Sequence, residues 1–206
     1  MIVVDIETSG LDFNKCGIWQ IGALELENPA NTFLEEARID DEDEILNDSQ
    51  AKKKVLEVTG KTKEEFRDKS KQSQKQLLEH FFKWCENIKI KNFVCQNPQF
   101  DYSFIALVKA KKYGLLLTFP YRAFDLHSIA QLKHFEVKGG FLIKEDKSDM
   151  GLTNILEFCG MRDNRKEHNA LEDAKLTAEA FSRLVYGKSL FPEYAEFPVP
   201  DYLKKE

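Results

Sequence analysis

The first residues of the chain combine an apolar run with two acidic side chains. Residues 2–4 are Ile, Val and Val, and Ile6 follows after a single acidic residue, Asp5. An apolar run of this kind is typical of a strand that is covered on both faces of a sheet. Successive side chains of a strand point to opposite faces, so Asp5 and Glu7 are predicted on the same face. The sequence therefore predicts a central strand that carries two carboxylates on one side.

Two further strands are predicted soon after the first. Residues 17–26 read Gly-Ile-Trp-Gln-Ile-Gly-Ala-Leu-Glu-Leu, and residues 31–34 begin a third, shorter strand. Asn28 and Pro29 between them are typical turn residues. We therefore expect these three strands to form an antiparallel meander.

Later segments repeat apolar residues at helical spacing. Residues 78, 81, 82 and 85 are Leu, Phe, Phe and Cys, which predicts an amphipathic helix that lies on the sheet. The same spacing recurs from residues 101, 126, 152 and 170, and short apolar segments at 93–95 and 122–124 predict a fourth and a fifth strand. Asp125 and Asn169 are placed to cap the helices that follow them. Alternating strands and helices predict an α/β domain.

The domain is predicted to cover residues 1–187. Its segment 35–76 contains an acidic run at 40–44 followed by a lysine run at 52–54, and charge runs of this kind favour a charged, solvated surface excursion. Residues 138–150 are expected to form a loop or small hairpin. Residues 188–206 are a Pro-rich C-terminal tail, expected to form an extended strap that packs onto the domain.

The composition agrees with one ordinary globular domain. Of 206 residues, 42% are hydrophobic and 32% are charged, and this length suffices for one well-buried core. The four cysteines have no metal-ligand spacing, which favours reduced structural thiols. No apolar run approaches the roughly 20 residues that span a bilayer, and a strand that starts at Ile2 leaves no room for a signal peptide. We therefore expect a cytoplasmic protein with no membrane contact.

Four carboxylates and one histidine carry the candidate chemistry: Asp5, Glu7, Asp101, His168 and Asp173. Two carboxylates on one face of an apolar strand are costly to bury without compensation, and the first basic residue of the chain comes only at position 15. Four carboxylates can hold a pair of divalent cations, and a histidine can take a proton from water. Taken singly, an aspartate such as Asp101 is more often a helix-start residue, and an isolated histidine such as His168 is more often a polar surface residue.

The spacing of these residues resembles a known family. The first motif reads Asp-Ile-Glu-Thr-Ser-Gly-Leu from Asp5, the second has the form N-x-x-F-D and ends at Asp101, and the third has the form H-x-x-x-x-D from His168 to Asp173. Together they resemble the DEDDh (DnaQ-like) group of 3′-to-5′ exonucleases. The histidine separates this group from relatives that use a tyrosine base.

The resemblance implies a ribonuclease H-like fold, with a five-stranded mixed sheet flanked by helices. It also implies a metal-dependent enzyme that hydrolyses phosphodiester bonds at 3′ ends of single-stranded DNA or RNA and releases nucleoside 5′-monophosphates. Asp5, Glu7 and Asp173 would bind one Mg²⁺ ion, and Asp5 with Asp101 a second. His168 would accept a proton from the attacking water. Hard oxygen ligands favour Mg²⁺, for which Mn²⁺ can substitute.

Three residues are expected to contact substrate by the same resemblance. The backbone around Thr8 would touch the 3′ hydroxyl, Leu11 would wedge against the terminal bases, and Phe100 would stack on a base. The alternatives are a simple turn with one core leucine, and a core position for Phe100 and its neighbour Phe104.

The net charge of −5 fits only some nucleic-acid binders, because phosphate contacts come mainly from Lys and Arg. Bound cations would reverse the field around clustered carboxylates. The stretch after Asp101 is comparatively basic and contains Lys109, Lys111, Lys112, Lys133, Lys138 and Lys144. This balance favours a substrate that is held mainly at its 3′ end.

A function of a different class also remains open at this point. The fold could serve as a catalytically silent nucleic-acid-binding module, although such a module gains nothing from clustered carboxylates. The sequence does not separate DNA from RNA as substrate, since that choice depends on contacts to the 2′ position. It also leaves open a homodimer, an association with a polymerase and the physiological pathway.

Overall fold

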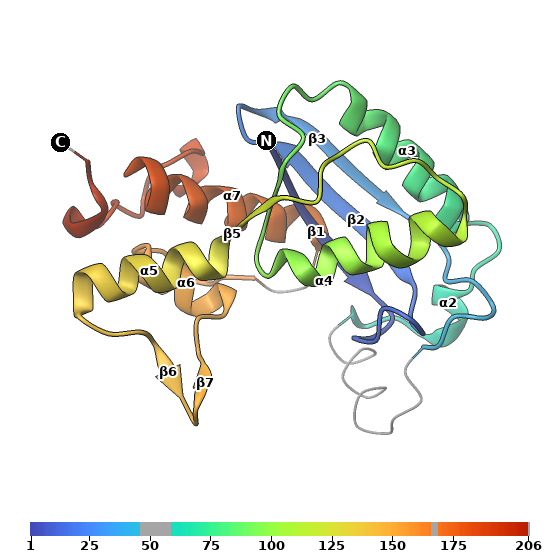
Figure 1. The fold of residues 1–206 in the computed structure, drawn as a ribbon, viewed down its shortest axis with the longest axis horizontal. Coiled ribbons are helices and arrows are strands. Elements are labelled where there is room, and N and C mark those ends of the chain that lie inside the picture. The colour runs from blue at the N-terminus through green and yellow to red at the C-terminus, as the bar shows by residue number, and fades with distance from the viewer. Residues whose placement is uncertain (46–58, 166–168, 206) are drawn as a thin grey trace.

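The protein is described here by a computed structural model that covers residues 1–45, 59–165 and 169–205. A five-stranded sheet has the strand order β3-β2-β1-β4-β5, with β1 in the centre (Figure 1). Its strands are β1 (Ile2–Thr8), β2 (Ile18–Glu25), β3 (Asn28–Glu36), β4 (Phe93–Cys95) and β5 (Ala123–Asp125). The first three pair antiparallel, whereas β4 runs parallel to both β1 and β5. The mixed sheet and the meander are confirmed.

The edge strand β3 is longer than the sequence predicts. The turn falls at residues 26 and 27, and Pro29 lies within β3, not in the turn. A proline has no N–H to donate, so it is tolerated in an edge strand and seldom elsewhere in a sheet. The prediction of a turn at Asn28 and Pro29 is therefore wrong by two residues.

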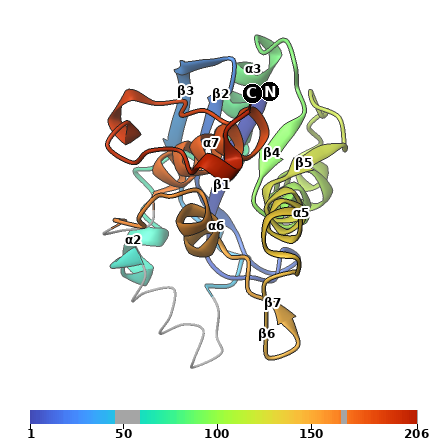
Figure 2. The same ribbon diagram turned by 90° about the vertical axis from the view of Figure 1, so that its left-hand side faces the viewer.

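Helices cover both faces of the sheet, as Figures 1 and 2 show from two directions. The first layer contains α3 (Gln74–Glu86), α4 (Pro98–Tyr102) and its continuation η1 (Ser103–Ala110). The second contains α5 (Leu126–Lys138), α6 (Leu152–Phe158) and α7 (Ala170–Tyr186). Ile2, Val4 and Ile6 of β1 belong to the core of the first layer, and Val3 to that of the second. By the same alternation, Asp5 and Glu7 lie on the face that α7 covers.

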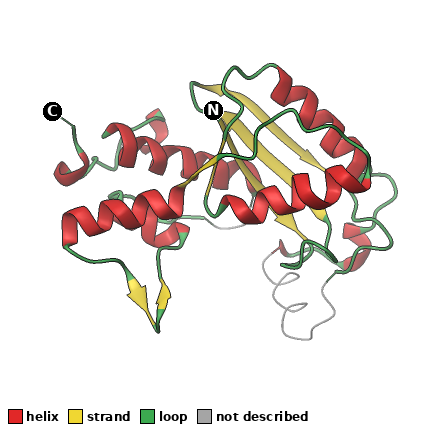
Figure 3. Ribbon diagram, in the orientation of Figure 1, coloured by secondary structure: helices red, strands yellow, loops and turns green. Residues whose placement is uncertain are grey.

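The remaining elements are short (Figure 3). They are the helix α2 (Lys63–Phe66), the hairpin strands β6 (Ile143–Lys144) and β7 (Lys147–Ser148), and the 3₁₀ turns η2 (Pro192–Tyr194) and η3 (Asp201–Leu203). The hairpin agrees with the prediction for residues 138–150, and all four cysteines are buried and free. None of the helices in the described ranges is long and apolar enough to cross a membrane.

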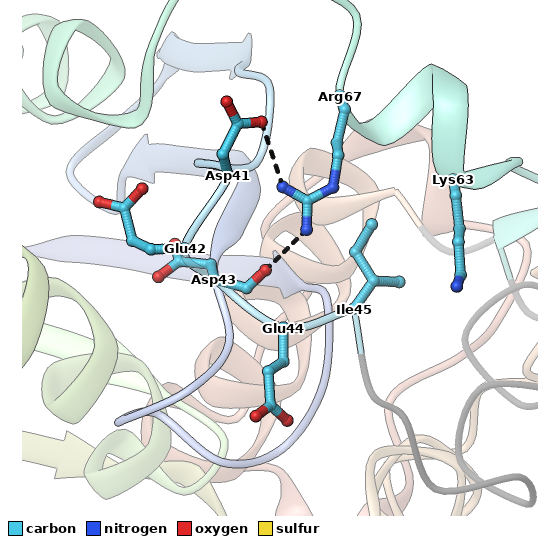
Figure 4. A pocket seen from close by; sticks show the side chains of 7 residues that line it. All are labelled: Asp41, Glu42, Asp43, Glu44, Ile45, Lys63 and Arg67. Carbon is cyan, nitrogen blue, oxygen red and sulfur yellow. Dashed lines mark hydrogen bonds and ion pairs between the residues drawn. The ribbon is translucent and has the colours of Figure 1, made fainter.

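The described part of the segment 35–76 has many exposed residues but also a few buried ones. Ile39, Ile45 and Phe66 are buried with Trp19 in a small core of their own. Arg67 holds the acidic run in place: it donates hydrogen bonds to the carbonyl oxygens of residues 40 and 43 and lies 3.4 Å from the carboxylate of residue 41 (Figure 4). The same acidic residues, with Arg67, line a pocket of about 250 Å³. Residues 46–58, which include the lysine run, lie outside the described part.

Part of the acidic run is neutralised by the lysines that follow Asp101. Lys109 is buried and lies 2.6 Å from the buried Asp43, and Lys112 lies 2.8 Å from both Asp40 and Glu42. The π-helical hydrogen bonding of η1 widens the helix, and Lys109 points into the protein. Lys109 is therefore engaged inside the protein, whereas Lys112 pairs with the acidic run at the surface.

The C-terminal tail packs onto α7 through a buried ion pair. Glu179 and Arg183 are both fully buried, with Arg183 Nε 2.6 Å from Glu179 Oε1. Glu179 also accepts hydrogen bonds from the backbone of Leu190 and Phe191, and Arg183 donates one to the carbonyl oxygen of Tyr194. The expectation that the aromatic residues of the tail pack down is met.

Candidate metal centre

Three of the predicted ligands meet where the end of β1 faces the first turn of α7. Asp5 and Glu7 project from β1, and Asp173 lies in the first helical turn of α7. A carboxylate oxygen of each lies within 4.8 Å of one from each of the others. Distances of this size between ligand oxygens match a single ion at about 2.0–2.5 Å from each.

The first turn of α7 reaches this position because β2 has a glycine where the two elements touch. A Cβ atom at Gly22 would lie 2.1 Å from the backbone nitrogen of Leu171. Gln20 lies two residues earlier on β2 and accepts a hydrogen bond of 2.8 Å from the backbone N–H of Ala170. Asn169 caps the helix by accepting from two of its first N–H groups. Gly22 is paired with Asp5 in the sheet register, so the close approach sets α7 directly beside the strand ligands.

Asp101 approaches from the other helix layer. It lies in α4, which begins after Asn97 in a left-handed backbone conformation and has Pro98 at its first turn. Proline is favoured there because the first N–H groups of a helix have no partner within the helix. Asp101 is only 4% exposed, and its charge acts on Asp5. The structure thus brings Asp5, Glu7 and Asp173 within ligand distance of one another, and Asp101 lies buried near Asp5.

The four carboxylates disfavour one another's charge. Burial raises the pKa of Asp5 well above its ordinary value, and repulsion from Asp101, Asp173 and Glu7 raises it further. Burial, with repulsion from Asp173, raises the pKa of Glu7 to about 7. Burial raises that of Asp101 to about 8, although a hydrogen bond from the backbone of Ile6 opposes the shift. Clustered carboxylates of this kind favour a bound cation, which would remove the repulsion.

An arginine that the sequence analysis did not identify lies beside the cluster. Arg165 Nη1 is 3.1 Å from Asp173 Oδ1. The other side of its guanidinium group makes two hydrogen bonds to Asp163, of 2.9 and 2.6 Å. Its only sequence signal is the Asp-Asn-Arg turn a few residues before His168.

The remaining predicted site residues have mixed outcomes. His168 lies outside the described residues, so its role stays a prediction. The hydroxyl of Thr8 donates to the carbonyl oxygen of Gly10, and Leu11 is 78% exposed, which excludes the alternative of a core leucine. Phe100 is half-buried with its ring 5.0 Å from that of Phe104, which is itself fully buried in the core. Contact of Thr8, Leu11 and Phe100 with substrate stays a prediction.

The donor set fits Mg²⁺ or Mn²⁺. All the ligands that the structure brings together are carboxylate oxygens, which these hard cations prefer. The site geometry therefore supports a divalent cation on chemical grounds.

The profile of an exonuclease family, RNase_T, matches residues 2–181. The chain belongs to this family, in its DEDDh, DnaQ-like group. A PolC-type DNA polymerase III from Thermotoga petrophila is 31% identical over 186 residues, which is 89% of this chain but 12% of the polymerase. The chain thus spans about an eighth of the curated relatives that it matches.

Solved structures of this family share the fold. The nuclease domain of 3′hExo, a DEDDh family member bound to rAMP, superposes with a TM-score of 0.60 at 17% identity, over 97% of this chain and 95% of that one. Exonuclease I of E. coli, in complex with a dT13 oligonucleotide, gives 0.65 at 15% identity, over 88% of this chain and 40% of that one. The predicted ribonuclease H-like fold is confirmed.

Proposed function

We propose that the protein is a metal-dependent 3′-to-5′ exonuclease that releases nucleoside 5′-monophosphates from single-stranded 3′ ends. The observation that carries this proposal is the meeting of Asp5, Glu7 and Asp173 within 4.8 Å, with Asp101 buried beside them. Family membership over residues 2–181 supports the same reaction. The exposed Leu11, next to the cluster in sequence, supports a substrate that ends at the site.

The chain's own residues would divide the work as follows. Asp5, Glu7 and Asp173 would hold one divalent cation, and Asp5 with Asp101 a second. When bound, such cations supply an acidified water and positive charge beside the leaving oxygen. His168 would accept the proton of the attacking water. Thr8 and Leu11 would position the terminal nucleotide, and Phe100 would stack on a base. We also propose that the protein acts in the cytoplasm.

Deoxyribose is the favoured sugar. The relative with 31% identity is a DNA polymerase, whereas the structures bound to rAMP and to dT13 are less similar in sequence and bind different sugars. We therefore propose single-stranded DNA as the preferred substrate and RNA as the slower one. Matched DNA and RNA oligonucleotides under one set of conditions would test this choice.

The decisive experiment uses a 5′-labelled single-stranded oligonucleotide with Mg²⁺. The label should shorten in one-nucleotide steps, and a 3′-terminal phosphate or a closed circle should block the reaction. His168→Ala should reduce turnover by about 10²-fold or more, the usual contribution of a general base. Cleavage of circles would contradict an exonuclease, and binding of the oligonucleotide without any cleavage would indicate a silent module instead.

A further inference from the structure

Arg165 places a fixed positive charge next to the carboxylate cluster. Its Nη1 atom lies 3.1 Å from Asp173 Oδ1, the distance of an ion pair. The charge lies near the whole cluster, because carboxylate oxygens of Asp5 and Glu7 lie within 4.8 Å of one of Asp173. The exposed fractions of the two paired side chains are 18% and 7%, so water screens this interaction only in part.

The orientation of Arg165 is itself constrained. Nε and Nη2 of the guanidinium group donate hydrogen bonds to the two carboxylate oxygens of Asp163. This bidentate geometry fixes the plane of the guanidinium group. The hydroxyl of Thr153, on α6, donates a hydrogen bond of 2.6 Å to the same carboxylate. Asp163 therefore fixes the orientation of Arg165, whose remaining nitrogen, Nη1, lies beside Asp173.

We propose that Arg165 is a positioning residue that serves as an internal counter-ion of the metal centre. This inference rests on the proposed function, because it assumes that Asp173 is a metal ligand. In the metal-free protein the guanidinium group offsets part of the repulsion among the carboxylates. Once a divalent cation binds, the like charge of Arg165 opposes it, so Arg165 lowers the affinity for metal while it stabilises the empty site.

Because Asp163 and Arg165 carry opposite charges, the proposal predicts opposite changes in cation affinity when each charge is removed. Removing Arg165 leaves the pair with a net negative charge, which should strengthen cation binding. Removing the charge of Asp163 leaves the pair with a net positive charge, which should weaken it. A purely structural role would instead weaken binding in both variants, because each would break the contacts between Asp163 and Arg165.

The experiment measures Mn²⁺ affinity of the full chain without nucleic acid, by isothermal titration and by the paramagnetic signal of free Mn²⁺. Arg165→Gln should bind Mn²⁺ about three- to tenfold more tightly than wild type, and Asp163→Asn about twofold or more weakly, as expected for single charges near a partly screened site. Arg165→Lys keeps the charge and should stay close to wild type. Arg162→Gln removes a neighbouring exposed charge and serves as the matched control.

Melting in EDTA provides a second readout. Arg165→Gln should melt below wild type without metal, and Mn²⁺ should raise its melting temperature by more than it raises that of wild type. Unchanged or weaker binding by Arg165→Gln would overturn the proposal, as would tighter binding by Asp163→Asn. If Arg165→Gln does not fold, Arg165→Lys still decides: Mn²⁺ affinity close to wild type supports a charge effect, and weaker binding indicates a structural role. Absence of Mn²⁺ binding by wild type would instead refute the metal centre itself.

Discussion

Helix α7 buries two acidic residues that have opposite surroundings. Glu179, in the middle of the helix, is surrounded by donors: Arg183 at 2.6 Å, the hydroxyl of Ser189 at 2.8 Å and two backbone N–H groups of the tail. Asp173, in the first turn, lies instead within 4.8 Å of the carboxylates of Asp5 and Glu7.

The difference separates a structural buried charge from a functional one. The protein satisfies Glu179 with its own donors, and the result is a tail fixed to α7. At the other end of the helix the carboxylates raise one another's pKa, and Arg165 offsets only part of their charge. A buried charge cluster whose compensation is incomplete is what a cation site requires.

The largest expected effect follows from a change in the cluster itself. Asp5→Asn should reduce cleavage by about 10³-fold or more, since several kcal/mol of charge stabilisation depend on the bound cations. In EDTA the same variant should be more stable than wild type, by roughly 1 kcal/mol, because one repelling charge is lost. Turnover and urea unfolding measure the two effects. Asp146→Asn, at the exposed hairpin tip, should change neither, and a less stable Asp5→Asn protein would argue against a repulsive cluster.

The ion pair between Glu179 and Arg183, which holds the tail on α7, should behave in the opposite way, because its loss should destabilise the protein. Arg183→Met leaves Glu179 buried without its cation, which should cost about 3–5 kcal/mol of unfolding free energy. Chemical denaturation measures this loss, and proteolysis should cut the released tail. Lys175→Met breaks only an exposed pair with Glu172 on the same helix and should cost less than about 0.5 kcal/mol. If both variants lost the same unfolding free energy, burial would not explain the importance of the pair between Glu179 and Arg183.

A substitution at the contact between β2 and α7 should affect both the stability of the protein and its affinity for metal. Gly22→Ala would place a methyl group against the backbone of Leu171, and α7 would have to move away from β2. We expect a loss of about 1–3 kcal/mol in stability, together with a loss of Mn²⁺ affinity because Asp173 moves with the helix. Gly140→Ala, where the added methyl group meets open space, is the control. Normal metal binding by Gly22→Ala would show that α7 is positioned by other contacts.

The smallest effect is expected from pH in the metal-free protein. Glu7 and Asp101 have pKa values raised to about 7 and about 8, so their protonated forms are favoured in the folded state. Stability from this source is complete below their ordinary pKa values and is lost as pH rises through 7 to 8. In EDTA, unfolding free energy should therefore fall on the order of 1–2 kcal/mol between pH 6 and pH 9. Saturating Mg²⁺ should reverse this trend, because it binds the ionised carboxylates. A metal-free protein whose stability rises over this range would contradict the raised pKa values.

Local patterns in the sequence were enough to predict much of the fold. The apolar run of β1 places Asp5 and Glu7 on one face through the period of a strand, and the helical spacing after Asp101 and Asn169 places Asp101 and Asp173 at helix starts. Each of these inferences depends on a few neighbouring residues and on backbone geometry that is the same in every protein. Their spatial meeting was expected from the family resemblance, and the structure brings Asp5, Glu7 and Asp173 within 4.8 Å of one another.

Other features depend on contacts between residues that are distant in the sequence. No basic residue precedes position 15, yet Arg165, far from Asp5 and Glu7 in the sequence, lies beside the cluster. Lys109 belongs to a stretch that is basic in sequence, but the widened helix η1 buries it against Asp43. Gly22 is one small residue in an apolar strand until α7 approaches it.

The sequence by itself thus determined which chemical groups the protein carries, on which strand face and at which helix starts they lie. The tertiary structure decided which charges compensate one another. Some of this compensation depends on distances of a few ångströms between segments far apart in the sequence, as for Lys109 and Asp43, which are separated by 66 positions. Local periodicity contains no information about such distances, because they are fixed only when the helices pack onto the sheet.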